Sequence, residues 1–360
     1  MVPRSSLLTF AIAVGLSGCG GDPNDPGDDP ARTWRMGFGA MAPRPTVEDV
    51  LATIDAWSPR ADAAIMHVGV PWGEMLDGRS AVDHVEGELA ALAALYRSRG
   101  LAVVFMADPT DGLARENEAP DLVARGRSIA EPEIRELYYD WIDAVTSLVA
   151  PDFLGLAAET NLIRAIAPAA TYDALVAMTD SSARRVAASP DAPTLFVSVQ
   201  VETAWGRLAG DGSYAGIAQD LADFPYAEVL GLSSYPYLGG FAEPAQIPLD
   251  YYARLHDDAG LPVMVVEGGW PSTSMSMPGF TFESSPAEQT AYIRHQARLL
   301  DEADAIGAFQ LTFTDLDLDA YPPGPAILPL FASLGLADTE LQLKPALAAW
   351  DNVFALPLDD

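Results

Sequence analysis

The stretch Val263-Met-Val-Val-Glu267-Gly-Gly-Trp270 is a short apolar run that ends directly in a glutamate. The stretch Phe153-Leu-Gly-Leu-Ala-Ala-Glu159 has the same form earlier in the chain. Such runs are typical of parallel β-strands, because helices cover both faces of these strands. The two stretches belong to a set of eight candidate strands, at residues 34–41, 63–69, 101–108, 152–159, 194–201, 229–235, 262–270 and 308–315.

Longer amphipathic segments with helix signals separate these strands. Thr46 is a candidate N-cap for the first helix, and Ser285 opens the seventh with a Ser-Pro-Ala-Glu capping box. Gly100 and Gly260 follow two other helices, at the position where a left-handed residue is favoured. The remaining helices are expected at residues 82–99, 131–149, 171–188, 214–223, 249–259 and 344–354.

The alternation of eight strands with eight helices over residues 33–358 predicts a single-domain α/β fold, the (β/α)8 TIM barrel. A doubly wound open sheet is the alternative, but it normally has fewer units and a glycine-rich first turn. The stretch Gly37-Phe-Gly39-Ala-Met41 does not complete that glycine pattern. Because no second domain and no repeat beyond the strand–helix unit is visible, the barrel is the expected fold.

Residues 1–18 have the features of a secretion signal. Arg4 provides one positive charge, and the apolar run at 7–16 is too short to span a bilayer as a helix. The stretch Leu16-Ser-Gly-Cys19 resembles the lipobox of bacterial lipoproteins, which implies lipidation of Cys19. An ordinary signal peptide with an accidental cysteine is the alternative. Residues 19–32, rich in glycine, proline and aspartate, are expected to form a flexible acidic tether.

The lipobox resemblance implies a lipid-anchored protein of the cell envelope, on the periplasmic face or on the cell surface. Cys19 is the only cysteine, so an intramolecular disulfide or a thiolate metal site is excluded. We expect no transmembrane helix in the mature chain, no cofactor and a monomer.

The charge of the chain limits its partners. With 51 acidic and 20 basic residues the net charge is −31, so the surface cannot neutralise the phosphates of a nucleic acid. Adhesion to anionic lipid by charge alone is equally disfavoured. A neutral carbohydrate is compatible with this surface, and so is the plainer interpretation that the acidity serves solubility.

Carboxylates and aromatic residues gather where the candidate strands end. In a barrel of this type the active site lies at the carboxyl ends of the strands. Acids there suit proton transfer and nucleophilic attack, and flat rings suit stacking on pyranose faces. The residues at these ends are Asp108, Glu159, Glu202, Trp205, Tyr235, Tyr237, Glu267 and Trp270.

Glu159 and Glu267 are distinguished by the apolar strands that lead into them. The fourth and seventh strands face each other across an eight-stranded barrel, so the two side chains can approach over its centre. Retaining glycosidases place two carboxyl groups about 5–5.5 Å apart, one as nucleophile and one as acid/base. A structural ion-pair network is the alternative role for both glutamates.

The pattern resembles the clan A glycoside hydrolases. The segment from Val229 to Tyr237 is similar to arabinogalactan endo-β-1,4-galactanases, and the segment from Val266 to Ser272 resembles the nucleophile region of galactanases and β-1,3-glucanases. The resemblance implies that Glu267 is the nucleophile and Glu159 the acid/base. It further implies that Tyr235 hydrogen-bonds the nucleophile and that two aromatic residues, Tyr237 and Trp270, stack on sugar. Asp108, Glu202 and Trp205 are cleft candidates without an assigned role.

Two departures from the clan pattern stand out. Ala158 occupies the position of the asparagine that normally precedes the acid/base and contacts the sugar 2-hydroxyl, although Asn161 is a candidate to reach the same space. The arginine of an early strand end is also not evident, since Arg35 lies inside the first strand. His67 lies on the second strand and could line the cleft, although we expect a satisfied core histidine.

The sequence therefore favours an envelope-anchored retaining glycosidase that acts on a galactan- or glucan-like β-linked glycan. A catalytically degenerate barrel that binds glycans is the main alternative, and Ala158 favours it. A barrel that uses a metal, with Asp108 and the acidic run Asp315-Leu-Asp-Leu-Asp319 as ligands, is a third possibility. That run lacks the glycine and the final glutamate of a calcium loop.

Overall fold

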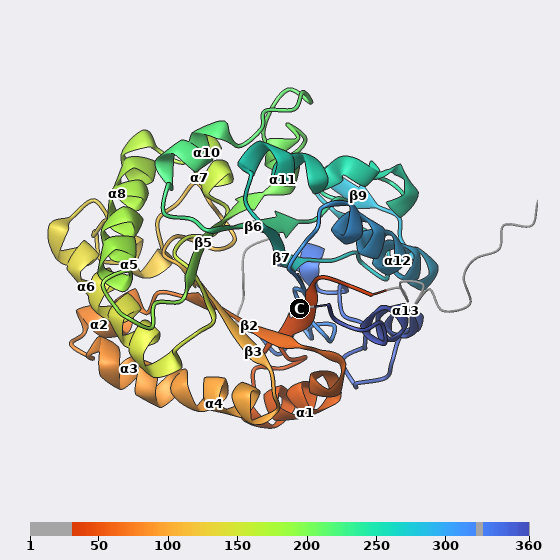
Figure 1. Cartoon of the computed structure of the whole chain (residues 1–360), viewed down its shortest axis with the longest axis horizontal. Coiled ribbons are helices and arrows are strands. Elements are labelled where there is room, and N and C mark those ends of the chain that lie inside the picture. Colours follow the sequence, from red (N-terminus) through yellow and green to blue (C-terminus); the bar gives the residue numbers. More distant parts are fainter. Residues whose placement is uncertain (1–30, 322–326, 360) are drawn as a thin grey trace, which may run out of the picture.

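The computed structural model describes residues 31–321 and 327–359 and contains a closed barrel of parallel strands in the order β1-β10-β7-β6-β5-β4-β3-β2. Figure 1 shows the helices as a ring around these central strands. The barrel strands are β1 (Arg35–Gly39), β2 (Ala63–Gly69), β3 (Ala102–Asp108), β4 (Phe153–Gly155), β5 (Thr194–Gln200), β6 (Val229–Ser234), β7 (Val263–Gly268) and β10 (Gly307–Gln310). The (β/α)8 barrel predicted from the sequence is confirmed.

Most predicted helices are present with shifted or divided bounds. The helices are α1 (Val47–Trp57), α2 (Trp72–Leu76), α3 (Ala81–Glu88), α4 (Ala90–Ser98), α5 (Pro120–Ala124), α6 (Pro132–Ala144), α7 (Thr160–Ile166), α8 (Ala169–Val186), α9 (Val201–Ala204), α10 (Ala218–Asp223), α11 (Ala253–Ala259), α12 (Pro286–Glu302) and α13 (Pro345–Phe354). The segment predicted as one helix at 82–99 is two helices that meet at Leu89, and the helix predicted at 131–149 ends in a π-helical turn, Val145–Val149. A hairpin of β8 (Met275–Met277) and β9 (Phe280–Phe282) is inserted between β7 and α12.

The predicted helix signals act as expected. The Thr46 side chain accepts a hydrogen bond from the Asp49 N–H, and Ser285 accepts one from Glu288. Gly260 has a φ of 60° at the end of α11, and Gly100 has a φ of 77° just after α4. These left-handed positions favour glycine because it has no Cβ.

The interior of the barrel is filled by large side chains that lie over glycines. A Cβ added to Gly155 would lie 2.5 Å from the ring of Phe196, and one added to Gly37 would lie 2.7 Å from the ring of Phe309. Phe196 and Phe309 join Ile65 in the inner apolar cluster. This packed layer closes the barrel beneath the carboxyl ends of the strands, so a ligand is accessible only above it.

The pairing of β6 with β7 contains an irregularity that determines where Glu267 lies. Leu232 pairs with Val265, but the next residue, Ser233, pairs with Glu267, so Val266 is one extra residue in β7. Val265 packs in the outer core and Val266 in the inner cluster. Strict alternation would send Glu267 to the outer face, and the bulge turns it into the barrel instead.

The folded body begins slightly earlier than expected. Arg32 is buried, forms an ion pair of 2.6 Å with Asp62, and forms a β-bridge with Leu358 near the other end of the chain. Arg32 is therefore part of the barrel and not of the tether. The expected signal peptide, Cys19 and the tether up to residue 30 lie outside the described residues, so lipidation stays a prediction. In the part of the chain that the structure describes, no helix is long and apolar enough to cross a membrane.

Candidate active site

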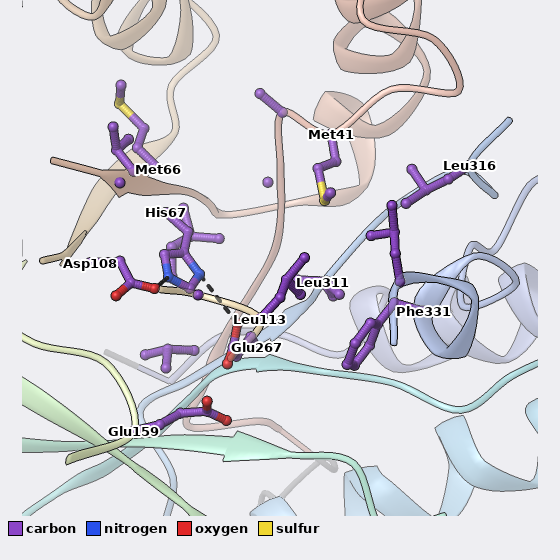
Figure 2. Close-up of a pocket in the computed structure, with 18 of the residues that line it drawn as sticks. Met41, Met66, His67, Asp108, Leu113, Glu159, Glu267, Leu311, Leu316 and Phe331 are labelled. Atoms are coloured by element: carbon purple, nitrogen blue, oxygen red, sulfur yellow. Dashed lines mark ion pairs between the residues drawn. The ribbon is translucent and has the colours of Figure 1, made fainter. Parts of the chain in front are cut away.

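A cavity of about 620 Å³ opens at the carboxyl ends of the strands. Its volume lies in the range of small-molecule sites, roughly 300–1,000 Å³. The titratable side chains that line it are His67, Asp108, Glu159, Tyr235 and Glu267. Figure 2 shows His67, Asp108, Glu159 and Glu267 together on one side of this cavity. The two glutamates singled out in the sequence thus face one space.

Glu159 occupies a strained position directly after β4. Its backbone has φ 49° and ψ 46°, a left-handed conformation, and it is the residue before the first turn of α7. The Glu159 N–H donates to Ser198 Oγ at 2.9 Å, which ties this position to β5. Non-glycine residues in this region are costly and cluster at functional sites. The strained backbone therefore favours a functional role for Glu159.

Arg115 is a site residue that the sequence did not reveal. It lies in the loop after β3, is buried, and donates from Nε to Glu159 Oε2 at 2.8 Å. Its Nη1 contacts both carboxylate oxygens of Asp108 at 2.7 Å. The clan pattern places an arginine at an early strand end. In this structure an arginine comes instead from a loop, where it pairs with Glu159, the acid/base candidate.

His67 lines the cavity, which corrects the expectation of a core histidine and agrees with the alternative of a cleft residue. Its imidazole is 26% exposed and lies between two carboxylates, with Nδ1 at 3.2 Å from Glu267 Oε2 and Nε2 at 3.4 Å from Asp108 Oδ2. Burial acts to lower its pKa, but the hydrogen bonds and charges of the two carboxylates raise the pKa of His67 to about 10. The ring is therefore an imidazolium cation at neutral pH.

Ser233 connects the two glutamates. Its hydroxyl donates to Glu159 Oε1 at 2.7 Å. Ser233 also pairs with Glu267 in the ladder of β6 and β7, and it contributes to the lower pKa of Glu267. Ser233 therefore lies beside both glutamates.

The two glutamates differ in proton affinity. Burial raises the pKa of Glu159, and the nearby charge of Glu267 adds to the rise against the opposing pull of Arg115. Burial acts on Glu267 in the same direction, but the hydrogen bond and charge of His67 lower the pKa of Glu267 below its usual range. One carboxyl therefore tends to hold a proton while the other stays ionised, which suits an acid and a nucleophile respectively.

Asp108 links the two cations of the site. Burial opposes its ionisation, but the charge of Arg115 and the hydrogen bond from His67 hold the pKa of Asp108 well below its usual range. Asp108 is buried and lines the cavity, as the sequence predicted for a cleft residue. Its role is to fix His67 and Arg115 against the two glutamates.

Tyr235 lines the cavity, but no hydrogen bond joins it to Glu267 in the part of the chain that the structure describes. Its ring packs edge-on against Phe331, with centroids 5.1 Å apart, and burial raises its pKa well above the usual value, with the charge of Glu267 adding to the rise. The groups that hydrogen-bond Glu267 and lower its pKa are His67 and Ser233. In this structure a histidine and a serine, and not Tyr235, therefore favour the ionised form of Glu267.

The prediction that Tyr237 and Trp270 stack on sugar is wrong in this structure. Both are buried, each 1% exposed, and both lie outside the cavity. The Tyr237 hydroxyl donates to the Leu330 carbonyl at 3.0 Å, and Trp270 stacks on Tyr292 with ring centroids 5.5 Å apart. These rings pack the core between β7 and α12, because aromatic side chains near a strand end can also be directed outward.

Asn161 does not replace the missing asparagine of the clan pattern. Its Nδ2 donates to the Gln200 carbonyl at 2.9 Å, and its Oδ1 accepts from the Gln200 N–H at 2.7 Å. Both amide groups are therefore used to hold β5, and Asn161 lies outside the cavity. Ala158 is fully buried in the inner cluster and offers no polar group in its place.

Glu202 and Trp205 also lie outside the cavity, contrary to prediction. Glu202 accepts from the Tyr235 N–H at 3.0 Å and from the Tyr251 hydroxyl at 3.0 Å, and burial raises the pKa of Glu202 to about 7. Trp205 stacks on Tyr251, with centroids 5.2 Å apart. Both residues pack beside the ends of β5 and β6, on the side away from the cavity.

The acidic run after the last strand is not arranged as a metal site. Asp315 forms an ion pair of 2.5 Å with Lys344 and accepts from the Gly335 N–H at 3.1 Å. Among residues 31–321 and 327–359, no group of three or more His, Cys, Asp or Glu side chains is placed to hold a metal ion.

His67 and Arg115 differ in how far the sequence indicates their place in the site. His67 follows Ala63 and Ile65 at a spacing of two, and all three face the barrel interior, so strand alternation alone predicts its direction. Arg115 lies in an irregular loop that returns over the site through its own turns. No periodic signal marks such a loop residue.

No protein-family model matches the sequence, and no curated protein matches it either. Several solved structures do match. An exo-β-1,4-mannosidase from Opitutaceae bacterium strain TAV5 is 17% identical over 90% of this chain and 59% of its own, with a TM-score of 0.62. GH5_18 from Bifidobacterium longum subsp. longum is 16% identical over 91% of this chain and 81% of its own, with a TM-score of 0.63. A beta-glucuronidase from an uncultured Clostridium sp. is 12% identical over 89% of this chain and 50% of its own, with a TM-score of 0.55.

The chain spans 59% of the mannosidase and 50% of the glucuronidase, so these proteins are considerably longer. At such low identity the likeness shows a shared fold, and a fold alone does not determine an activity. The chain is a (β/α)8 barrel of the kind found in these glycosidases.

Proposed function

We propose that this chain is a retaining glycoside hydrolase that cleaves a β-linked glycan with Glu159 and Glu267. The observation that carries the proposal is that two buried carboxyl groups face one cavity at the strand ends and have pKa values shifted in opposite directions. The strand-end resemblance favours a galactan- or glucan-like substrate. The barrels of a β-1,4-mannosidase and a β-glucuronidase add mannosides and glucuronides to the candidates.

The proposed reaction has two displacements. In the first, a Glu267 oxygen attacks the anomeric carbon while the bond to the leaving oxygen breaks, and Glu159 delivers its proton to that oxygen. In the second, the Glu159 carboxylate takes a proton from water, whose oxygen attacks the anomeric carbon and releases Glu267. The first displacement leaves Glu159 ionised, as the second requires, and the second leaves Glu159 protonated for the next cycle.

The Ser233 hydroxyl can change its hydrogen-bond acceptor when Glu159 loses or gains its proton. A hydroxyl has one hydrogen, so Ser233 can donate to only one of its two carboxylate neighbours at a time. While Glu159 is protonated, we expect the hydroxyl to donate to ionised Glu267. Once Glu267 is esterified, the hydroxyl can donate to Glu159, with the oxygens 2.7 Å apart.

A glycan-binding barrel without catalysis is the second candidate. Ala158 offers no contact to a 2-hydroxyl, Asn161 is occupied by Gln200, and the ion pair with Arg115 favours an ionised Glu159. Contacts to the 2-hydroxyl are among the groups that supply several kcal/mol of transition-state stabilisation. This candidate therefore predicts glycan binding with no turnover.

The experiment that separates the two is a panel of 2,4-dinitrophenyl β-glycosides of mannose, glucose, galactose and glucuronic acid, followed by trapping with the matching 2-fluoro sugar. We expect turnover of at least one glycoside and a stoichiometric covalent adduct on Glu267. An adduct that is absent from Glu267→Gln supports the assignment. Measurable glycan binding with no turnover on the whole panel would contradict the hydrolase proposal and support the binding barrel.

Removing the charge of His67 is expected to shift the pH profile. In His67→Gln the pKa of Glu267 rises, so the acidic limb of kcat/KM moves to higher pH because activity requires ionised Glu267. We expect kcat/KM to fall roughly 10- to 100-fold, since a hydrogen bond to a charged group is worth about 1.5–3 kcal/mol. The measurement is kcat/KM against pH on the aryl glycoside that turns over.

Two variants control for a purely structural effect. His84→Gln changes a buried histidine that lies outside the cavity and has its Nδ1 2.9 Å from the exposed Glu74, and its profile should match the wild type. His67→Arg keeps a cation beside Glu267 and should restore the acidic limb toward the wild-type position. An unshifted limb in His67→Gln would show that His67 does not act on the nucleophile.

A further inference from the structure

One wall of the catalytic cavity is made of apolar side chains that no step of the proposed reaction uses. This apolar wall consists of Met41, Leu311, Leu316, Leu328 and Phe331. Figure 2 shows four of them, Met41, Leu311, Leu316 and Phe331, on the side of the cavity away from Asp108 and Glu159. The cavity thus has a charged side and an apolar side.

Four of the five side chains of the apolar wall are aliphatic and offer no flat ring on which a pyranose could stack. None of its five side chains carries a hydroxyl, amide or charged group that could replace the water lost from a sugar hydroxyl. A polar group that is buried without a partner costs free energy, whereas apolar surface gains from burial. Met41 is 37% exposed and Phe331 is half-buried, so this surface is open to a ligand.

The position of the apolar wall indicates which part of a substrate would lie against it. Met41 follows β1, and the other four residues follow β10, which lies between β1 and β7 in the barrel. The wall is therefore beside Glu267 and across the barrel from β4, which leads into Glu159. In a double displacement the leaving group departs on the side of the acid, and the transferred sugar stays on the nucleophile.

We propose that the sugar transferred to Glu267 carries an apolar substituent, such as a fatty-acyl or alkyl group, that packs on the wall of Met41, Leu311, Leu316, Leu328 and Phe331. The proposal rests on the assignment of Glu267 as nucleophile and names the substrate class of the same site. The wall is continuous with the cavity that holds both glutamates, so a substituent can reach it without leaving the site. A cavity of about 620 Å³ leaves room beside one sugar ring for such a group.

The test compares 4-nitrophenyl β-glycosides that differ only on the transferred sugar. The glycone is whichever of mannose, glucose or galactose the enzyme turns over, and it carries a free O6, a 6-O-octanoyl ester or a 6-O-succinyl ester. We expect the octanoyl compound to raise kcat/KM by at least about tenfold, mainly through KM, because a buried methylene is worth up to roughly fourfold in binding. The succinyl compound, with its charged end, should show no gain.

Two variants of the apolar wall test whether the gain in kcat/KM depends on it. Phe331→Ser and Leu311→Asn should reduce the ratio of kcat/KM for the octanoyl compound to kcat/KM for the free-O6 glycoside. Leu343→Asn alters a leucine that is 60% exposed and lies outside the cavity, so its preference should equal the wild type. An octanoyl compound that is turned over no faster than its free-O6 parent would overturn the proposal. A gain produced instead by an octyl leaving group would do so as well.

Failure of this inference is distinguishable from failure of the hydrolase proposal. Turnover of the free-O6 glycoside without an octanoyl preference would leave the hydrolase intact and remove the apolar substituent. If no glycoside turns over, calorimetric binding of the octanoyl and succinyl mannosides still tests the wall. Tighter binding of the octanoyl compound, lost in Phe331→Ser, supports it, and equal binding contradicts it.

Discussion

Replacing Glu267 with alanine is expected to remove hydrolysis almost completely, with a loss on the order of 10⁴-fold or more in kcat on activated aryl glycosides. The variant has no carboxylate to form the glycosyl ester, and a small anion can occupy the vacated space. Added azide should therefore restore consumption of the substrate and give a glycosyl azide of inverted configuration. Product configuration is measured by proton NMR.

Glu159→Ala should behave differently, because an acid matters less when the leaving group departs without a proton. We expect near-normal formation of the glycosyl ester from 2,4-dinitrophenyl glycosides and a slow second displacement that azide accelerates with retained configuration. Glu243→Ala, which changes an exposed glutamate, is the control and should retain full activity. Inverted azide products from Glu159→Ala would reverse the proposed roles of the two glutamates.

Arg115→Met is expected to lower the free energy of unfolding by about 3–5 kcal/mol, because it leaves two buried carboxylates without their shared cation. Both Asp108 and Glu159 are buried, and Arg115 contacts them at 2.7 and 2.8 Å. The measurement is denaturant unfolding of the wild type and the variant at neutral pH. Asp108→Asn added to Arg115→Met should recover part of the loss, since one of the two unpaired charges is then absent.

The matched control is Arg125→Met. Arg125 also contacts two carboxylates, Asp77 at 3.0 Å and Asp121 at 3.4 Å, but these partners are exposed. Exposed ion pairs are worth about 0–1 kcal/mol, so this variant should unfold almost as the wild type does. Equal losses in the two arginine variants would contradict the buried network.

The pH dependence of the Arg115 effect has a definite sign. The pKa of Asp108 is held below its unfolded value, so its stabilising contribution is present above the unfolded pKa and is lost as the pH falls toward the folded pKa. In Arg115→Met this depression is weakened, and burial makes protonation of the carboxyl easier. The deficit of the variant relative to the wild type should therefore shrink as the pH is lowered from neutral to acidic.

Local sequence patterns predict the barrel well because each strand is a local apolar run and each helix has its own start or stop signal. Ser285 and Gly260 act where their chemistry predicts. Strand length is less predictable, since tertiary pairing determines where a ladder ends. The strand expected at 152–159 pairs as β4 only over Phe153–Gly155, and Glu159 leaves the strand conformation altogether.

The candidate site was predictable at its two glutamates and not in their surroundings. Glu159 and Glu267 are marked by the apolar runs before them, a signal that lies within a few residues of each. Trp270 shows the limit of this reasoning, because one aromatic residue after a strand can serve a sugar or the core with the same local sequence. Arg115 meets Glu159 across 44 residues, and only the folded loop brings them together.

Because of the bulge in β7, the direction of the Glu267 side chain depends on the number of residues that precede it in the strand. Val266 could be exchanged for another apolar residue, since the inner cluster requires only its volume and polarity. We expect a deletion of that single residue to keep every titratable side chain of the cavity and still turn Glu267 away from His67 and Ser233. We therefore expect insertions and deletions in β7 to displace Glu267 more than most substitutions in this strand do.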